Sequence, residues 1–326
     1  MKNNPSASPG LPASKRSRSE KIHILGCGAV GLALAAYLAD AGRRVVAVRT
    51  SRSDVPLNTV NVTIRSNTAI TVPIETVSLS RLSQIDGVVV ITSKSYANHA
   101  IAAELSKKRC AGPIVIMQNG LGVEDPFLRE GQFAQVCRCI LYITGQTTSE
   151  NEVVFRSISS SPIGMIKGTA SELAEYVALL TTTGFPFHAE IDIERDVWRK
   201  AIMNAVFNSI CPLLDIDNGI FVRDEEVAKL GKEIISECTH LASCKGVSFN
   251  ESDLVEQMMK ISQGSGGMLI STLQDIKNGR ETEMESLNLE MARIASTMTP
   301  AISLPKTEIL GRLVLAKSTF KRPLAA

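Results

Sequence analysis

A glycine-rich turn between two apolar segments near the N-terminus constrains the fold of this chain more than any other feature. In the stretch KIHILGCGAVGLALAAYLADAGRRVVAV, residues 22–25 predict a short buried strand before the turn. Residues 31–41 then predict a helix that stops at Gly42, and residues 45–48 predict a second strand. The sequence therefore predicts a complete β-α-β unit.

Each of the three glycines in this turn suits a different requirement of a dinucleotide-binding site. Gly26 makes the turn, Gly28 lets the backbone approach a pyrophosphate, and Gly31 lets the helix pack closely on the strand. The N-terminus of the helix then faces the anion. A glycine turn without a ligand is the alternative interpretation. The candidate cofactor-binding residues of the turn are Gly26, Cys27, Gly28, Ala29, Val30 and Gly31.

The end of the second strand bears on which nicotinamide nucleotide the turn would bind. Sites for NAD usually place an acidic residue there to bind the ribose 2′-hydroxyl. This chain instead has Arg49 and Arg52 there, and the first acidic residue after the strand is Asp54. The pattern favours NADPH, whose 2′-phosphate suits an arginine, and Arg49 is the better candidate because it follows the strand directly. The alternative is that both arginines are solvated loop residues.

Further strand signals follow the β-α-β unit. Residues 60–64 and 69–74 alternate between apolar and polar, which predicts an antiparallel pair or an edge insertion. Residues 87–92 and 113–117 are continuous apolar runs, which suit parallel strands covered on both faces of a sheet.

Two polar residues follow these apolar runs. Lys94 comes after the first run and Asn119 after the second, at the carboxyl ends where open α/β sheets bind ligands. Taken singly, Lys94 fits an exposed loop lysine and Asn119 fits an ordinary turn. Their shared position makes both of them candidate cofactor-binding residues.

The pattern changes to helical after about residue 190. The fold class predicted is therefore α/β, with a dinucleotide-binding domain at residues 21–190 and an all-helical domain at residues 191–320. Apolar faces of the helices offer a surface for a homodimer, although no long heptad seam is present. The predicted helices span residues 194–210, 224–245, 251–262, 268–277 and 280–298.

One predicted helix carries a polar stripe on an otherwise apolar surface. In DVWRKAIMNAVFN, Lys200, Asn204 and Asn208 recur at every fourth position among apolar residues. Burying such groups without partners costs on the order of several kcal/mol, so the stripe is expected to face a polar network or a ligand in a cleft between the domains. The alternative is that Lys200 reaches solvent while the asparagines bond nearby backbone.

Composition excludes several classes of protein. With 35 Lys and Arg against 33 Asp and Glu, the net charge of +2 gives no sign of a nucleic-acid partner. The seven cysteines are scattered and never spaced as CxxC, so neither a disulfide framework nor a metal site is expected. No apolar run approaches the roughly 20 residues that span a bilayer. We therefore expect a soluble protein in a reducing cytoplasm.

The first twenty residues, MKNNPSASPGLPASKRSRSE, form a region of different composition. They combine proline, serine and basic residues without hydrophobic periodicity, which predicts a disordered tail at residues 1–20. An organelle presequence and a basic address at KRSR are the alternatives.

The motifs, taken in order, resemble those of a known family. ILGCGAVG, TSKSY, QNGLG, VWRKAIMNAVFN, DNG at 217–219, STLQDI and GRETEMESLN occur in the order and approximate spacing of ketopantoate reductases, also called 2-dehydropantoate 2-reductases. The resemblance runs from about residue 21 to 315. It implies an N-terminal Rossmann domain, a helical C-terminal domain, and NADPH-dependent reduction of ketopantoate to pantoate on the route to pantothenate and coenzyme A.

The resemblance also implies roles for individual residues. Lys200 would be the general acid, and Glu283 would be an essential carboxylate near the substrate hydroxyl and the cofactor, where it could hold Lys200 in position. Without the motif, Glu283 has the pattern of an exposed helix glutamate. Asn119 would contact cofactor and substrate, and Lys94 and Arg49 the cofactor. The residues implied to bind substrate are Asn119, Lys200, Asn204, Asn208, Asn218 and Ser271.

The chain also departs from the family pattern. Asn208 is followed by SICPLL where many members have NPL directly at this asparagine, and Leu289 replaces a usual glycine after Asn288. Both changes would reshape the substrate pocket. Two alternatives therefore stay open: a reductase of another branched 2-keto acid, and a protein that binds NADP(H) without turnover. The sequence leaves open the oligomeric state and feedback by coenzyme A.

Overall fold

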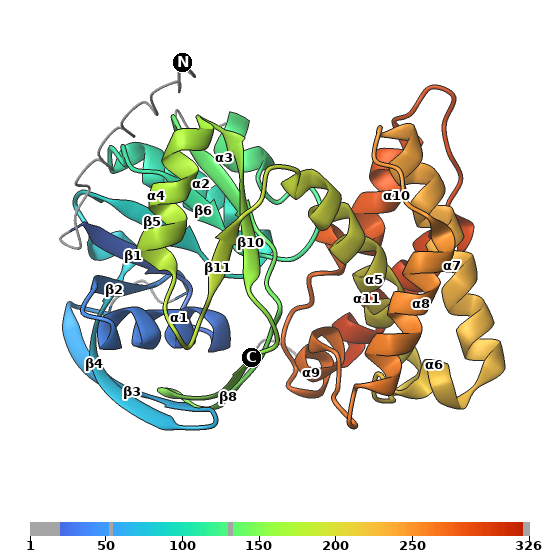
Figure 1. Ribbon diagram of the computed structural model, residues 1–326, viewed down its shortest axis with the longest axis horizontal. Coiled ribbons are helices and arrows are strands. Elements are labelled where there is room, and N and C mark those ends of the chain that lie inside the picture. Colours follow the sequence, from blue (N-terminus) through green and yellow to red (C-terminus); the bar gives the residue numbers. More distant parts are fainter. Residues whose placement is uncertain (1–19, 52–54, 130–132, 322–326) are drawn as a thin grey trace, which may run out of the picture.

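The computed structural model describes residues 20–51, 55–129 and 133–321. Nearly all of the predicted tail, and with it Arg52 and Asp54, lies outside the described residues. Figure 1 shows two halves side by side: a sheet half (residues 20–189) and a helical half (residues 193–321). The predicted α/β class, with an N-terminal sheet followed by a helical region, is confirmed.

The described strands form one eleven-stranded sheet in the order β11-β10-β7-β6-β5-β1-β2-β4-β3-β9-β8. Parallel pairing joins β1 to β2 and β5, β5 to β6, and β6 to β7, whereas β10 runs antiparallel to β7. The strands are β1 (Lys21–Leu25), β2 (Arg44–Arg49), β3 (Asn58–Arg65), β4 (Ala69–Ser78), β5 (Val88–Ile91), β6 (Ile114–Ile116), β7 (Val136–Cys139), β8 (Ile143–Ser149), β9 (Glu152–Ser157), β10 (Ser161–Lys167) and β11 (Phe187–Ala189).

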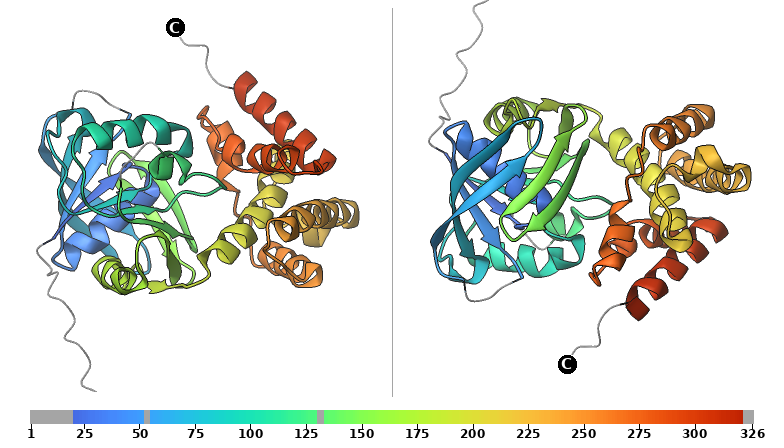
Figure 2. Two further views of the ribbon diagram at one scale, coloured as in Figure 1. Left: turned by 90° about the horizontal axis from the view of Figure 1, so that it is seen from above. Right: turned by 90° about the horizontal axis from the view of Figure 1, so that it is seen from below.

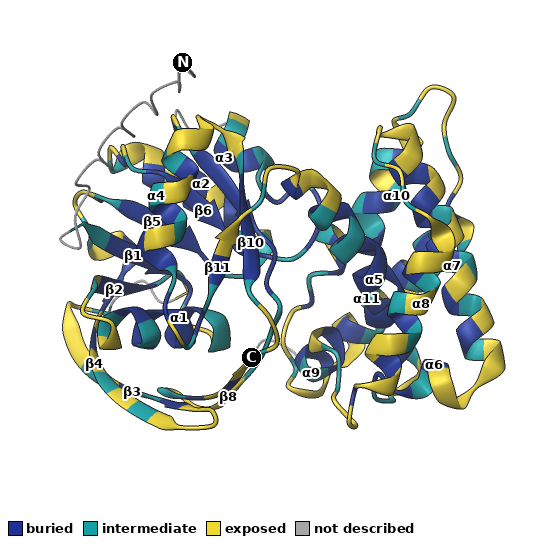
Figure 3. Ribbon diagram, in the orientation of Figure 1, coloured by how far each residue is buried: buried dark blue, intermediate teal, exposed yellow. Residues whose placement is uncertain are grey.

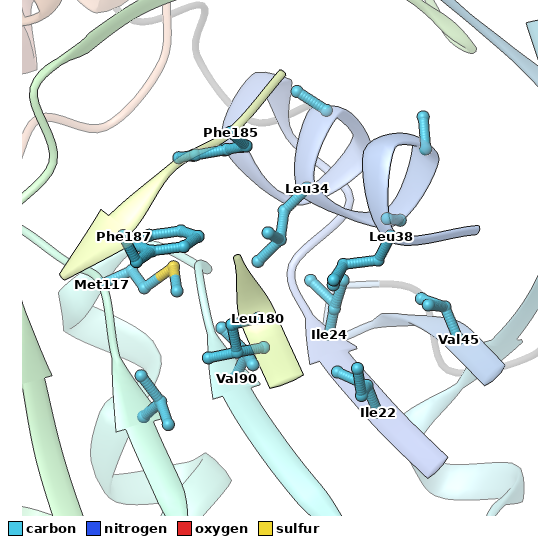
Figure 4. Packing of buried hydrophobic residues seen from close by; sticks show 14 of the residues in the cluster. Ile22, Ile24, Leu34, Leu38, Val45, Val90, Met117, Leu180, Phe185 and Phe187 are labelled. Atoms are coloured by element: carbon cyan, nitrogen blue, oxygen red, sulfur yellow. The ribbon is translucent and has the colours of Figure 1, made fainter. Parts of the chain in front are cut away.

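Helices cover both faces of the parallel part of the sheet, which explains why its strands are continuously apolar. Successive side chains of β5 point to opposite faces: Val90 packs with α1 (Ala29–Asp40) and α4 (Ala170–Leu180), and Val89 with α2 (Asn98–Lys107). Figure 4 shows the first of these cores, where side chains from α1 meet those of the strands. A short helix, α3 (Asp125–Arg129), adds to the second core.

The β-α-β unit forms as predicted, and it places three polar loops at one edge of the sheet. Because β1 pairs with β2 on one side and β5 on the other, the chain leaves β1 at a topological switch point. Gly26 follows β1, Lys94 follows β5 and Asn119 follows β6, all at the carboxyl ends of parallel strands. The N–H of Ser93 donates to Leu25 O at 2.9 Å, which ties the first two loops together.

The alternating segments at 60–64 and 69–74 form β3 and β4, which pair antiparallel as predicted. They are not an edge insertion, because β4 also pairs with β2 and β3 also pairs with β9. The hairpin of β8 and β9 supplies the edge beyond them.

The helical half is built around α5, which is buried over most of its surface (Figure 3). The apolar ring predicted around its polar stripe packs against α7, α9 and α11. No helix that the structure describes combines the length and the apolar character that crossing a bilayer requires. The helices of this half are α5 (Ile193–Leu214), α6 (Ile220–Arg223), α7 (Glu225–Cys244), α8 (Glu251–Gln263), α9 (Ser271–Lys277), α10 (Asn288–Ser296) and α11 (Pro305–Lys321).

The prediction of a helix over residues 280–298 was wrong for the first part of that range. Residues 280–283 are not helical, η3 (Met284–Ser286) is a short 3-10 turn, and α10 begins only at Asn288. The physical reason is contact with the other half: the Ser286 carbonyl accepts the N–H of Leu121 at 2.9 Å and Glu283 bonds Lys94 and Ser95, and these tertiary contacts override the local helical pattern.

Candidate active site

The glycine turn after β1 has the geometry that a dinucleotide requires. Gly26 has φ +119°, and a Cβ there would lie 2.4 Å from Ser93 N. A Cβ on Gly31 would lie 1.8 Å from Gly26 O, so close helix-strand packing requires this glycine. A Cβ on Gly28, in contrast, would meet nothing within 4 Å. Packing therefore explains two of the glycines, and the third leaves open space above the turn.

That open space lies at the N-terminus of α1. Gly28 is the N-cap residue of α1, and no side chain caps the helix. Cys27, Ala29 and Val30 are partly exposed around it. The free N–H groups and the helix dipole make this position suitable for a pyrophosphate, and the turn fits a bound dinucleotide.

Arg49 lies beside the turn at the end of β2. Its Nη2 lies 3.2 Å from Oε1 of Glu150, and Glu150 is 57% exposed. Burial raises the pKa of the neighbouring Cys27 thiol to about 11, and the positive charge of Arg49 opposes that rise. Arg49 itself is only 13% exposed, so the solvent-exposed Glu150 is the partner that a phosphate group at the turn can replace.

Lys94 joins the two halves of the protein. Its Nζ donates to Asp275 Oδ2 at 2.7 Å and to Glu283 Oε2 at 3.1 Å, both in the helical half. The other oxygen of Glu283 accepts the N–H of Ser95 at 3.0 Å. Burial opposes the charge of Lys94, but Glu283 and Asp275 outweigh it and raise the pKa of the lysine. We call this arrangement of Lys94, Asp275 and Glu283 the carboxylate bridge.

Glu283 therefore differs from the exposed helix glutamate that its neighbours in the sequence indicated. Its side chain is only 13% exposed and precedes a 3-10 turn, so it is not an exposed helix glutamate. In this structure it bonds Lys94, and no bond to Lys200 is present among the described residues. Its predicted position near a cofactor at the sheet edge is compatible with these contacts.

Asn119 lies at a second contact between the halves. Next to it, Gly120 has φ +104°, and a Cβ there would lie 2.3 Å from Ser286 O. Ser286 also bonds Ser95 through the two hydroxyl groups at 2.9 Å. Within the described residues no group hydrogen-bonds the half-buried side chain of Asn119, which leaves its amide available at this contact.

Lys200 has a different environment from Lys94. It is half-buried on α5, which begins beside the sheet half and runs into the helical half (Figures 1 and 2). Among the described residues no carboxylate pairs with its Nζ, and the ring of Tyr142 lies 5.7 Å from that atom. Burial lowers the pKa of Lys200. An ammonium with a lowered pKa and no acidic partner is suited to proton transfer.

The predicted asparagines lie in the helical half with buried amide groups. Asn204 is 7% exposed and Asn218 is 8% exposed. Asn204 Nδ2 and Asn218 Oδ1 are buried atoms without a partner among the described residues. Leaving such groups unpaired costs on the order of 1–3 kcal/mol each, so both amides are poised for a polar ligand.

Asn208 and Ser271, both predicted to bind substrate, lie in contact with each other. Asn208 Oδ1 accepts from Thr272 Oγ1 at 2.7 Å and, at a longer 3.5 Å, from Ser271 Oγ. These bonds come from the start of α9 and orient the amide of Asn208. Its Nδ2 has no partner among the described residues, so the donor end remains available.

The sequence interpretation missed two residues of the carboxylate bridge region, Asp275 and Ser95. A signal for Asp275 was present, because it lies four positions after Ser271 on the same face of a predicted helix. Ser95 contributes mainly its backbone N–H, for which the sequence carries no signal. Within the described residues no cluster of three His, Cys, Asp or Glu residues is placed to hold a metal ion.

Two protein families match the sequence of this chain, one over the sheet half and one over the helical half. The family described as ketopantoate reductase PanE/ApbA matches residues 22–168, and the family described as ketopantoate reductase PanE/ApbA C terminal matches residues 192–318. A 2-dehydropantoate 2-reductase of Archaeoglobus fulgidus is 27% identical over 278 residues, covering 83% of this chain and 89% of the relative. Another from Halobacterium salinarum is 30% identical over 220 residues, covering 66% and 72%.

Solved structures share the fold. A PanE/ApbA family ketopantoate reductase from Ralstonia eutropha has a TM-score of 0.81 at 21% identity, covering 92% of this chain and 99% of that one. A D-mandelate dehydrogenase with NADH and anilino(oxo)acetate has a TM-score of 0.80 at 19% identity, with the same coverage. A ketopantoate reductase from Staphylococcus aureus, described as dimeric, has a TM-score of 0.76 at 21% identity, covering 92% and 99%.

Proposed function

The chain belongs to the ketopantoate reductase family, and we propose that it reduces 2-dehydropantoate to pantoate with NADPH, using Lys200 as the proton donor. The reaction would serve the synthesis of pantothenate and coenzyme A. The observation that carries the proposal is the ammonium of Lys200, which has no carboxylate partner among the described residues. It lies one helical turn from the unpaired amide of Asn204.

Residues of the sheet half would hold the cofactor. The turn from Gly26 to Gly31 would bind the pyrophosphate, and Asn119 would contact both cofactor and substrate. Arg49 supports NADPH over NADH, because it stands at the end of β2 where an NAD site usually has an acidic residue. When bound, the cofactor supplies the hydride that is added to C2 of the keto acid.

Lys200 would complete the reduction at the C2 oxygen. As C2 gains a hydride, the carbonyl π electrons move to the oxygen, and Nζ gives its proton to that oxygen to form the alcohol. The lysine becomes a neutral amine, which its buried position tolerates better than the cation, and regains a proton from water. Until then its positive charge stabilises the developing alkoxide.

The asparagines and Ser271 would recognise the rest of the substrate. Carboxamides and a hydroxyl can bond a carboxylate and a primary hydroxyl without introducing a competing acid or base. The unpaired atoms of Asn204 and Asn218 and the oriented amide of Asn208 are the groups available for this role. Glu283, held by Lys94 and Ser95 N–H, would sit close to the substrate hydroxyl and the cofactor.

The proposal also covers the domain boundary, the cellular location and the oligomeric state of the protein. We place the division between the NADP-binding and substrate domains at residues 190 and 191, and the protein in the cytoplasm. A homodimer through the helical half is supported by α11, on which Ile309, Leu313 and Phe320 are exposed and share one face.

A reductase of another branched 2-keto acid is the second candidate. Leu289, which follows Asn288 where the family usually has glycine, favours it because the side chain narrows the space beside α11: a Cβ on Gly311 would lie 3.2 Å from Leu289 Cδ2. We propose that this packing carries through to the substrate pocket, which would then select a different side chain on C3.

A panel assay tests the proposal. Purified protein is mixed with NADPH or NADH and with each of several 2-keto acids, and the absorbance of the reduced nicotinamide is followed. We expect NADPH to be oxidised selectively with ketopantoate. A preference for another keto acid would support the second candidate, and NADPH binding without oxidation would indicate a non-catalytic binding protein.

A further inference from the structure

The charged form of Lys200 needs a source of stabilisation, because burial works against it and the described residues supply no carboxylate. The contact recorded for the ammonium among the described residues is with an aromatic ring. Nζ of Lys200 lies 5.7 Å from the centroid of Tyr142, within the roughly 6 Å over which a cation is attracted to a ring face.

The backbone of Tyr142 is held from both sides. Its N–H donates to Oγ of the fully buried Ser161 at 3.0 Å, and its carbonyl accepts the N–H of Ile158 at 2.9 Å. These bonds anchor the residue, which lies between β7 and β8, against the first residue of β10 and the connection that precedes it. The position of the ring is therefore set by the sheet half.

The same strand also fixes the start of the helix that carries Lys200. A Cβ on Gly164 in β10 would lie 2.2 Å from Ile193 Cβ, the first residue of α5, so α5 begins in direct contact with this strand. One strand thus bonds Tyr142 through Ser161 and supports α5 through Gly164. The ring and the ammonium meet across the two halves because both the backbone of Tyr142 and the start of α5 contact β10.

The charged groups near the Tyr142 ring do not supply a counter-charge to the Lys200 ammonium. Asp196 and Arg199 act on Tyr142, but they are paired with each other at 3.2 Å. Burial and then Asp196 raise the pKa of the Tyr142 phenol, so the ring stays neutral at working pH, with Arg199 opposing and Cys139 adding to the rise. The Lys200 ammonium therefore contacts the face of a neutral Tyr142 ring.

We propose that Tyr142 is a positioning residue that seats the Lys200 ammonium against its ring and stabilises the charged, proton-donating form. This inference rests on the proposed role of Lys200 as proton donor. The aromatic face, rather than the hydroxyl, carries the effect, because the structure records Nζ against the ring and no bond between Nζ and the phenol oxygen among the described residues.

Removing the ring should lower the pKa of Lys200 further. Reduction needs the protonated lysine, so the alkaline limb of kcat against pH should move to lower pH. A desolvated cation–π contact is worth enough to shift that limb by about one pH unit. Binding of NADPH should be unchanged, because Tyr142 is not among the residues proposed to hold the cofactor.

The test measures kcat against pH for the full chain with saturating NADPH and its best keto acid, together with the Kd of NADPH. Tyr142→Leu and Tyr142→Met remove the ring, and Tyr142→Phe is the matched control that keeps it. We expect both ring-free variants to show the shifted limb with wild-type Kd, and Tyr142→Phe to follow the wild type within about twofold. The Met side chain has about the volume of Leu but is unbranched and flexible, so it can adapt to the vacated space and keeps the test informative where the Leu variant does not fold.

Two results would overturn the proposal: a wild-type alkaline limb in a folded ring-free variant, or a Tyr142→Phe variant that behaves like the ring-free ones. Lys200→Ala, assayed in parallel, separates this failure from failure of the proposed function. If Lys200→Ala keeps its turnover, the donor assignment is wrong; if it loses turnover while the ring-free variants keep the wild-type limb, only the role of Tyr142 is wrong.

Discussion

The carboxylate bridge predicts a measurable loss of stability when Asp275 becomes asparagine. Asp275 Oδ2 accepts from Lys94 Nζ at 2.7 Å, and its other oxygen lies 3.2 Å from Nε of Arg280. Breaking a fully buried ion pair costs about 3–5 kcal/mol. The Lys94 side chain is 35% exposed and Glu283 stays 3.1 Å away, so solvent screening and the second carboxylate reduce the expected loss to about 1–2 kcal/mol.

Urea unfolding of Asp275→Asn and wild type measures this difference. We expect a lower midpoint with an unchanged slope. Glu256→Gln is the matched control, because Glu256 and Lys260 form a pair 2.6 Å apart whose side chains are 65% and 71% exposed. The control should unfold at the same urea midpoint as wild type. An Asp275→Asn variant as stable as Glu256→Gln would refute the reasoning.

The same bridge predicts how the difference depends on pH. The carboxylates raise the pKa of Lys94 in the folded protein above its ordinary value of 10.5, although burial opposes them. A raised pKa contributes stability that is fully present below the unfolded value and is lost as pH rises through the folded value. The gap between wild type and Asp275→Asn should therefore be constant near neutral pH and shrink above pH 10.5.

Two pairs of substitutions separate binding from stability elsewhere in the site. Gly28→Ala, whose Cβ meets nothing within 4 Å, should weaken NADPH binding while changing the unfolding free energy by less than about 0.5 kcal/mol; Gly31→Ala, whose Cβ would lie 1.8 Å from a carbonyl oxygen, should destabilise the fold itself. Calorimetry of both variants checks this, and equal stability of the two would contradict it. Asn208→Leu should cost about 1–3 kcal/mol of stability because it leaves donors of Thr272 unpaired. Asn204→Leu should raise KM for the keto acid without a stability loss, and an unchanged KM would remove Asn204 from the substrate pocket.

Local patterns were sufficient to predict the β-α-β unit and the polar stripe of α5. The glycine turn depends on steric requirements of neighbouring residues, and the stripe on one helical period, so both are visible in short windows of sequence. The position of β3 and β4 inside the sheet was not visible, because it depends on β9, which pairs with β3 from about 90 residues later.

Glu283 shows the limit of such patterns most clearly. Its neighbours Glu281 and Glu285 are typical of an exposed helix, and only the family motif indicated a role. The helix fails there because Ser286 bonds Leu121 of the other half, and Glu283 then turns toward Lys94. Contacts between distant segments decided this region, and no local pattern reports them. The family resemblance did indicate a role for Glu283, because a family motif reflects the whole fold and not only the neighbouring residues.

The most direct test of the account is the turnover of Lys200→Ala with NADPH and ketopantoate, measured together with the Kd of NADPH. An exposed lysine on α7, changed in Lys229→Ala, serves as the control. Because positioned proton donors contribute about 10²–10⁴-fold, we predict a loss of that size in kcat for Lys200→Ala, with wild-type NADPH affinity. A Lys200→Ala variant that turns over at the wild-type rate would contradict the central claim.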